Sequence, residues 1–418
     1  MPPRLAKRAR VSGPEPAIVA PDPHEDKHVV FTAWSKQRGV EIKNVKPAKI
    51  PGRGLGLVTT AKIKVGARIL FVPEKAMFKP DGSVPHASPQ AQLAASAMKA
   101  CTAADSNMGI WKETWPVDSD FQHSLPMRWP HELREHFPVS VMQPLLRQEE
   151  DYAKDVGAVQ DFLAAGNHTA EDFRYYWSIV NSRSFHFKAK GKIGTMVMCP
   201  FIDYINHGPS GTTCDVFQRP NGYEVIADRD YVAGEEILAN YGAHNNDKLL
   251  VHYGFMIASV ANEWSDEEDA GPNDTPNRDD DIRLDHIVLP MLTPTVRAQL
   301  QDVGFLRGYA LLPATNELCF KTQVAVRAML LTCNEWEYFV ENGEDLAEDQ
   351  SHAVSHFLLH PFHEHRDYAA RAFRTVEDKS DWEEYSSMKN ELEMLRMRWL
   401  QIITAIECYM DMKPGSTT

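Results

Sequence analysis

The first structured part of the chain shows a period of two in its apolar positions. Beyond about residue 31, and most clearly from Val40 to Phe78, β-branched and polar residues alternate, and Pro-Gly and Val-Gly pairs interrupt the run. Alternation with such breaks is typical of short strands joined by turns. The same pattern returns at IGTMVMCPFIDYINH and continues through YEVIADRDYVAGEEILANYG. Because both segments have this character, we predict one β-rich domain over residues 28–260.

A helical segment interrupts that domain. Apolar residues recur three and four positions apart in QAQLAASAMKA and in VMQPLLRQEEDYAKDVGAVQDFLAA. This spacing predicts a helical insert at approximately residues 88–173. After the insert, we expect the apolar stretch 201–205 to be a core strand that Asn206 and His207 end, because the following Gly-Pro pair signals a turn.

The last third of the chain has a helical period. Residues 261–281 are acidic and rich in Pro and Asn, which indicates a linker or surface loop. A helical domain is predicted after it, over residues 282–415. From Trp382 to Met412, apolar residues stand three and four positions apart, as on one face of a single helix.

One segment of this domain is rich in histidine. SHAVSHFLLHPFHEH places His352, His356 and His360 four residues apart, so on one helix they would share a face. No acidic or cysteine residue stands at a clear ligand spacing, and Pro361 would end the helix after His360. We therefore favour a surface or packed histidine-rich helix over a zinc site.

Composition and charge narrow the classes of function. The formal net charge of −14 argues against binding to the phosphate backbone of nucleic acids and suits a basic protein surface as partner. The six cysteines show no close pair, so neither a zinc cluster nor a disulfide framework is indicated. With no signal peptide and no long apolar run, we expect a soluble intracellular monomer without a membrane partner. Residues 1–27 resemble a disordered tail, and their KRAR is compatible with nuclear import, so we expect a cytoplasmic or nuclear location, or both.

Four short stretches contain residue types that could carry chemistry. Taken singly, each has an ordinary structural reading: a β-turn, a structural arginine, a histidine at a strand end and a tyrosine at a strand end. The first is not G-x-G-x-x-G and no βαβ unit follows it, which argues against a dinucleotide site. The last also predicts a short capped helix. The stretches are PGRGLGLV (51–58), VNSRSFHF (180–187), FIDYINHGP (201–209) and DYVAGEEILANYGAHNNDKLLVHYGF (230–255).

In this order, the four stretches resemble a SET domain over roughly residues 31–260. The insert, the absence of a cysteine-rich post-SET motif and the helical C-terminal third resemble the Rubisco large-subunit methyltransferase type, which includes non-histone lysine methyltransferases and the actin-histidine methyltransferase. The resemblance implies an α+β fold. It would consist of a SET domain of several small β-sheets with a pseudoknot, interrupted by the helical insert and followed by an all-helical, substrate-binding C-terminal domain.

The resemblance also implies a cofactor, S-adenosyl-L-methionine, and no metal. Tyr241 would be the catalytic residue, while Tyr253 and Phe185 would line the channel for the substrate side chain. The turn formed by Arg53, Gly54, Leu55 and Gly56 would lie along the cofactor through its backbone, and Arg183 would bind the methionine carboxylate. Asn206 would bind the amino-acid end of the cofactor, and Asp203, three residues earlier, would support the turn. The His207 backbone would bind adenine, and Phe255 would stack near it.

The function expected from this resemblance is S-adenosylmethionine-dependent N-methylation of lysine in a non-histone protein. Two alternatives stay open: methylation of histidine in the same architecture, and a SET-like fold that binds a partner or performs other chemistry. The presence of Arg183, Asn206, His207 and Tyr241 together argues against the second alternative, since a domain that had lost the reaction could lose them.

Overall fold

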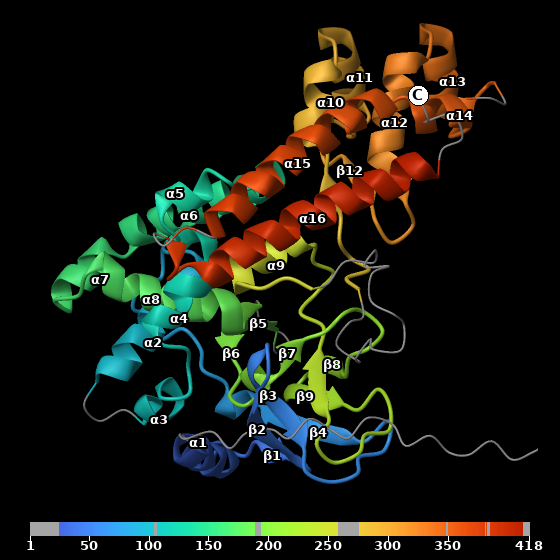
Figure 1. The fold of residues 1–418 in the computed structure, drawn as a ribbon. Helices are drawn as coiled ribbons and strands as arrows, with labels where there is room; N and C mark the ends of the chain where they lie inside the picture. The colour runs from blue at the N-terminus through green and yellow to red at the C-terminus, as the bar shows by residue number, and fades with distance from the viewer. Residues whose placement is uncertain are drawn as a thin grey trace, which may run out of the picture.

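The structure, a computed structural model, describes residues 25–103, 107–188, 194–257, 276–347, 350–380, 382 and 385–412. Small sheets lie at one end of the molecule. Two long helices, α15 (Leu359–Ser380) and α16 (Lys389–Asp411), run side by side across its middle toward the other C-terminal helices (Figure 1). The predicted α+β class is confirmed. Among the described residues, no helix combines the length and apolar character needed to cross a lipid bilayer.

Two four-stranded sheets form the β-rich part. Their strand orders are β1-β4-β9-β8 and β2-β3-β10-β7. Each pairing in them is antiparallel except that of β7 with β10, which is parallel and places Leu238 opposite Asn206 and Ala239 opposite His207. The strands are β1 (Glu41–Ile42), β2 (Val45–Ile50), β3 (Gly54–Thr59), β4 (Arg68–Pro73), β7 (Asn206–His207), β8 (Asp215–Arg219), β9 (Gly222–Ile226) and β10 (Glu236–Ala239).

The helices between β4 and β5 form the predicted insert, because strands from before and after them share the same two sheets. Ser88 caps the first helix by accepting from the backbone N–H of Ala91 at 3.1 Å. The predicted limit at residue 173 falls inside the last helix, which continues to Arg183. The elements are η1 (Glu74–Ala76), α2 (Pro89–Thr102), α3 (Met108–Lys112), α4 (Asp118–Ser124), η2 (Pro126–Arg128), α5 (His131–Arg134), α6 (Val139–Ala158), α7 (Gln160–Ala165) and α8 (Ala170–Arg183).

The chain leaves α8 directly into a two-stranded sheet of β5 (Ser184–Phe187) and β6 (Thr195–Met198). The strand predicted for residues 201–205 is wrong. Phe201 has a φ of 75°, and Ile202–Tyr204 form the short 3₁₀ helix η3, so the strand begins only at Asn206. Phe201, Tyr204 and Ile205 are buried, which shows that this apolar run reflects core packing rather than strand structure.

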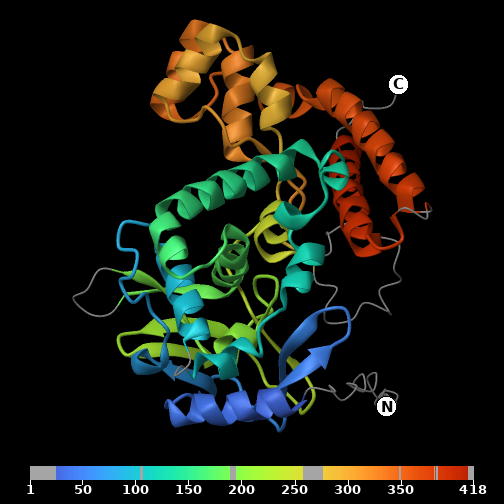
Figure 2. The same cartoon turned by 90° about the vertical axis from the view of Figure 1, so that its left-hand side faces the viewer.

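A helix that the sequence analysis missed lies near the start of the described chain. Helix α1 (Glu25–Gln37) begins within the predicted tail and covers positions where strands were expected; residues 1–24 of the tail lie outside the described residues. Phe31 and Trp34 are buried, and each ring lies within 6.0 Å of the Trp111 ring of α3. Figure 2 shows α1 at the end of the molecule opposite the C-terminal helices.

The C-terminal region is mostly helical, as predicted, but it also contains a three-stranded sheet, β11-β12-β13. Its final helix begins only at Lys389: Trp382 lies outside it and is 52% exposed. The elements are β11 (Ile282–Arg283), α10 (Asp285–Met291), α11 (Pro294–Asp302), β12 (Ala310–Leu312), β13 (Glu317–Leu318), α12 (Phe320–Leu330), α13 (Cys333–Asn342), α14 (Gln350–His356), α15 (Leu359–Ser380) and α16 (Lys389–Asp411).

The histidine-rich segment is divided between two helices. Helix α14 ends at His356 and α15 starts at Leu359, so His360 does not share a helix with His352 and His356. Pro361 lies in the first turn of α15, where its missing N–H leaves no intrahelical bond unmade, and therefore it begins a helix instead of ending one. In the part of the chain that the structure describes, no three His, Cys, Asp or Glu side chains are placed to hold a metal ion.

The prediction of a linker or surface loop over residues 261–281 is wrong at the C-terminal end of this segment. Residues 261–275 lie outside the described residues, but Asn277 and Asp280 are only 2% and 3% exposed. They belong to a buried polar cluster between α9 (Asn246–Tyr253) and α16. This end of the segment is therefore part of the packed structure and not a surface loop.

Candidate functional site

A cavity of about 310 Å³ lies where β5, η3 and the end of β10 meet. Its lining combines Arg183 with several aromatic residues. The lining residues are Ser182, Arg183, Ser184, Phe185, His186, Ile202, Asp203, Ile205, Val216, Tyr223, Ala239, Asn240, Tyr241 and Tyr253.

Tyr241 is held at both its backbone and its hydroxyl. Its backbone N–H donates to Nδ1 of His207 at 3.0 Å, and its hydroxyl donates to the carbonyl oxygen of Ile205 at 2.7 Å. Burial raises the pKa of the Tyr241 hydroxyl, so the group stays neutral near pH 7. Because its hydrogen is committed to Ile205, the oxygen lone pairs remain available as acceptors at the cavity wall.

His207 serves this site as a neutral acceptor. Its side chain is buried, and burial lowers the pKa of the ring to about 4. Nδ1 must be unprotonated to accept from the Tyr241 N–H. The imidazole therefore fixes the backbone of the tyrosine without carrying a charge.

Four rings pack around this point. The ring of Tyr241 lies 5.0 Å from that of His207 and 5.2 Å from that of Tyr253, and Phe255 contacts both His207 and Tyr253 at 5.9 and 6.2 Å. The predicted capped helix α9 delivers Tyr253: Asn245 caps it by accepting from the Lys248 N–H at 2.9 Å. Gly254 then ends α9 in the left-handed region at φ 78°, where a Cβ would lie 2.8 Å from the backbone oxygen of Ser124. This turn directs Phe255 back toward the site.

Arg183 is anchored by η3. Its Nη1 donates to the Asp203 carbonyl at 2.8 Å and lies 3.8 Å from the Asp203 carboxylate, which is 2% exposed. Trp111 donates its indole N–H to this carboxylate at 3.0 Å, and burial raises the pKa of Asp203. Within the described residues, Nε of Arg183 is buried and has no hydrogen-bond partner. The arginine, which lines the cavity, therefore keeps an unpartnered donor.

The glycine-rich turn meets the Asn-His strand beside the cavity. Arg53 Nη2 donates to the carbonyl oxygen of His207 at 2.6 Å, and Asn206 Nδ2 donates to Glu236 Oε1 at 2.9 Å. Glu236 also lies 3.4 Å from Arg53 Nε. A Cβ on Gly56 would come within 2.8 Å of Asn206 Nδ2 and 2.5 Å of Ile50 Cδ1, so any other residue here would force these side chains to shift.

The structure thus brings the predicted residues together in two adjoining groups. Five line the cavity: Phe185, Arg183, Asp203, Tyr241 and Tyr253. The others lie beside it and are joined to Tyr241 through His207: Arg53, Gly54, Leu55, Gly56, Asn206, His207 and Phe255.

Several residues at the site were not predicted, among them Tyr223 of the cavity lining, Glu236 and Trp111. Glu236 stands in the GEEI motif, which was quoted without a role for its carboxylate, although a buried acid beside an Arg turn is a signal that could have found it. Trp111 gave no signal, because it lies in the insert and is 92 residues from Asp203 in sequence.

Comparisons with known proteins agree with this geometry. Residues 54–242 match the family model described as the SET domain. The chain is 25% identical over 238 residues to the ribosomal lysine N-methyltransferase set11 of Schizosaccharomyces pombe, which covers 56% of this chain and 54% of that protein. It is 23% identical over 261 residues to an actin-histidine N-methyltransferase of Canis lupus familiaris, covering 56% of this chain and 43% of that protein. The match therefore spans about half the length of these curated relatives.

The fold resembles that of a solved structure over most of its length. A crystal structure of the SET domain of LSMT, bound to methyllysine and AdoHcy, superposes with a TM-score of 0.59 and 16% sequence identity. The superposition covers 93% of this chain and 92% of that one. It therefore includes the helical C-terminal region as well as the sheets.

Proposed function

Because this chain carries a SET domain, we propose that it is an S-adenosyl-L-methionine-dependent protein N-methyltransferase that acts on lysine in a non-histone protein. One observation carries the proposal. The same cavity presents a free guanidinium donor, on Arg183, and a neutral tyrosine oxygen, on Tyr241, within an aromatic wall.

The residues present fit the cofactor. The unpartnered Nε–H of Arg183 suits a carboxylate, for which arginine is the favoured partner. A side chain at Gly56 would displace Asn206 or Ile50, and a glycine at this point lets the backbone of the turn lie close to a ligand. Arg53, Asn206 and His207 would complete this side of the site. When bound, S-adenosylmethionine supplies a methyl group on a positively charged sulfur.

The aromatic part of the cavity lining suits an aliphatic amine. The rings of Phe185, Tyr223 and Tyr253 belong to it, and such walls favour the neutral form of a lysine, because burial disfavours the charged amine. A neutral amine has the free lone pair that methyl transfer requires. The lone pairs of the Tyr241 hydroxyl can accept weak C–H···O contacts from a methyl group and hold it in line.

The name of the S. pombe relative and the net charge of −14 support a basic protein as substrate. We also propose that the protein acts as a monomer in the cytoplasm, the nucleus or both. The name of the canine relative favours a second candidate, a protein-histidine N-methyltransferase.

The test is to incubate the full chain with a cell lysate and S-[methyl-³H]adenosylmethionine, and to locate the methyl group in the labelled protein by mass spectrometry. Tyr241→Phe keeps the ring packed on His207 and Tyr253 but removes the hydroxyl, so we expect label incorporation to fall by at least about 100-fold. Tyr152→Phe is the matched control, because it removes a hydroxyl that also donates to a backbone carbonyl at 2.7 Å, that of Ala170 in the insert.

The outcomes separate the candidates. A methyl group on lysine supports the proposal, and one on histidine supports the second candidate. Full activity of Tyr241→Phe would refute the assigned role of the hydroxyl. No label with the wild type, together with no heat on titration of S-adenosylmethionine, would indicate a SET-like fold that has another use.

A further inference from the structure

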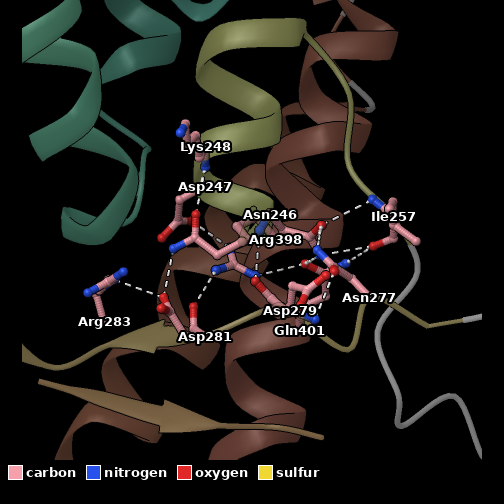
Figure 3. Close-up of polar contacts among 12 residues, drawn as sticks. Asn246, Asp247, Lys248, Ile257, Asn277, Asp279, Asp281, Arg283, Arg398 and Gln401 are labelled. Carbon is pink, nitrogen blue, oxygen red and sulfur yellow. Dashed lines mark hydrogen bonds and ion pairs between the residues drawn. The ribbon is translucent and has the colours of Figure 1, made fainter. Parts of the chain in front are cut away.

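A fully buried arginine joins the C-terminal helix α16 to the β-rich part of the molecule. Arg398 is 0% exposed, and its Nε donates to Asp247 Oδ1 at 2.7 Å while its Nη1 donates to Asp280 Oδ2 at 2.8 Å. Its Nη2 donates to the carbonyl oxygen of Asp281 at 3.3 Å. Figure 3 shows this fork of three contacts, with the guanidinium between α9 and the segment that precedes β11.

The partners of Arg398 hold the start of α9. Asp247 lies in the first turn of this helix, and Asp280 accepts from the backbone N–H of Asn246 at 2.8 Å. Asn245, the cap of α9, donates to Asp281 Oδ1 at 2.7 Å. The beginning of the helix that carries Tyr253 at its other end is thus fixed by groups that themselves depend on Arg398.

Amide side chains complete the cluster. Asn246 Nδ2 donates to the carbonyl oxygen of Ile257 at 2.9 Å and to Gln401 Oε1 at 3.1 Å, and Gln401 in turn accepts from Arg398 at 3.0 Å. Since Ile257 follows Phe255 closely, the segments on both sides of α9 are tied to α16. Figure 3 shows Asn246 and Ile257 facing Gln401.

The cluster reaches the Tyr241 loop through His244. Asn277 donates to the carbonyl oxygen of His244 at 3.0 Å and to Asn246 Oδ1 at 3.1 Å. The His244 ring stacks on that of Tyr253 at 6.1 Å and 24°, and Tyr253 packs against Tyr241. Residues 241–246 are therefore bounded by His207 on one side and by the Arg398 cluster on the other.

We propose that Arg398 is a positioning residue for the methyl transfer. It holds α9 and residues 241–246, the Tyr241 loop, so that Tyr241 and Tyr253 face the cavity. The link to methyl transfer rests on the proposed function, whereas the positioning of the Tyr241 loop and of α9 does not. It gives α16 a role in catalysis that is separate from any contact with a protein substrate.

The geometry requires a guanidinium and not merely a positive charge. Besides the bond to Gln401 of its own helix, Arg398 donates from three nitrogens to three acceptors on α9 and on the segment before β11. A lysine ammonium, a compact point charge on a flexible stem, cannot reproduce this planar fork. Arg398→Lys therefore keeps the charge that the buried carboxylates need but loosens the connection between the segments.

The experiment measures the full-chain Arg398→Lys variant in two ways. Amide hydrogen exchange is followed by mass spectrometry in peptides that cover residues 240–257, and we expect faster exchange than in the wild type. The initial rate of ³H-methyl incorporation into lysate proteins is measured at saturating S-adenosylmethionine and several lysate concentrations. We expect the limiting rate to fall by about 10- to 100-fold, as for misplaced reacting groups, while calorimetry shows a nearly unchanged Kd for S-adenosylmethionine.

Arg327→Lys is the matched control. Arg327 forms a similar two-nitrogen pair with Asp345, at 2.7 Å for both bonds and 10% and 11% exposed, but within the C-terminal helical region. This variant should lower the Tm without changing either exchange in residues 240–257 or the limiting rate.

If Arg398→Lys does not fold, Asn277→Ala takes its place, because it removes no group that bonds to Arg398. It removes the amide bonds to His244 and Asn246 and the acceptor for the backbone N–H of Asp279. Wild-type exchange in residues 240–257 in a folded variant would overturn the inference, whether or not the protein transfers methyl groups. Faster exchange with an unchanged limiting rate in an active enzyme would overturn the link to catalysis. A wild type that incorporates no label would count against the proposed function alone, since the exchange result still decides the positioning.

Discussion

The Nδ1 atom of His207 accepts a hydrogen bond from the backbone N–H of Tyr241, over 3.0 Å, across the parallel pair β7 and β10. The residue expected to touch a cofactor with its backbone thus uses its side chain to fix the tyrosine expected to perform the catalytic role. Two motifs that are 34 residues apart in sequence become one unit. Changes at His207 should consequently affect both the fold and the position of Tyr241.

The first prediction concerns pH. Because burial lowers the pKa of His207 to about 4, the unfolded state binds more protons than the folded state between the ordinary value of 6.5 and about 4. The contribution of His207 to stability is therefore present above pH 6.5 and declines as the pH falls through this window. His207→Phe keeps an aromatic ring but removes the acceptor. In urea unfolding, its loss of stability relative to the wild type should be larger at pH 7.5 than at pH 5, and a difference that does not depend on pH would contradict the assignment.

A second prediction tests the free donor of Arg183. Arg183→Met preserves much of the aliphatic packing but removes the group that faces the cavity, so the Kd for S-adenosylmethionine should rise by about 10- to 100-fold, the size of a lost charge-assisted hydrogen bond. Isothermal titration calorimetry measures it. Arg174→Met, on the same helix and paired with Glu171 at 3.1 Å, is the control that should bind normally. Equal affinities of the two variants would exclude Arg183 from the cofactor site.

A third prediction concerns the contact between the glycine turn and Asn206. In Gly56→Ala the new methyl group would press on Asn206, which Glu236 holds at 2.9 Å, so the variant should lose about 1–3 kcal/mol of stability, as is usual for overpacking. Its Kd for S-adenosylmethionine should also rise. Gly109→Ala is the control, because no atom lies within 4 Å of a Cβ there. A Gly56→Ala protein with the Tm and affinity of the wild type would show that the turn has room to adjust.

Much of the site could be predicted because its motifs are local in sequence. The order of the glycine turn, Arg183, the Asn-His pair and Tyr241 was sufficient to predict that these residues gather. In the structure Arg183 and Tyr241 line one cavity, and the glycine turn and the Asn-His pair are joined to Tyr241 through His207. Their roles toward the cofactor stay predictions. The apolar run 201–205 was wrongly predicted to be a strand, because a buried strand and a buried 3₁₀ turn can have the same composition. The backbone of Phe201, with a φ of 75°, is what differs from a strand here.

Residues whose partners are distant in sequence could not be predicted. Trp111 and Arg398 bind carboxylates that are 92 and 151 residues away, and nothing in their neighbourhoods indicates it. Arg398 stands in a helix among other charged residues, where an arginine usually faces solvent. Pro361 shows the same limit on a local scale, since proline marks either the end or the start of a helix, and the packing of α15 decides which.

The pairing of Arg398 with Asp247 also affects the order in which the protein folds during its synthesis. A growing polypeptide that has emerged only as far as α9 already contains every motif of the site, yet it lacks the helix that secures the Tyr241 loop, because α16 is translated last among the described elements. Such separated contacts form late and slow the folding of a chain. A nascent chain at that stage would therefore expose Asp247 and the neighbouring amides until α16 has also emerged and packs against them.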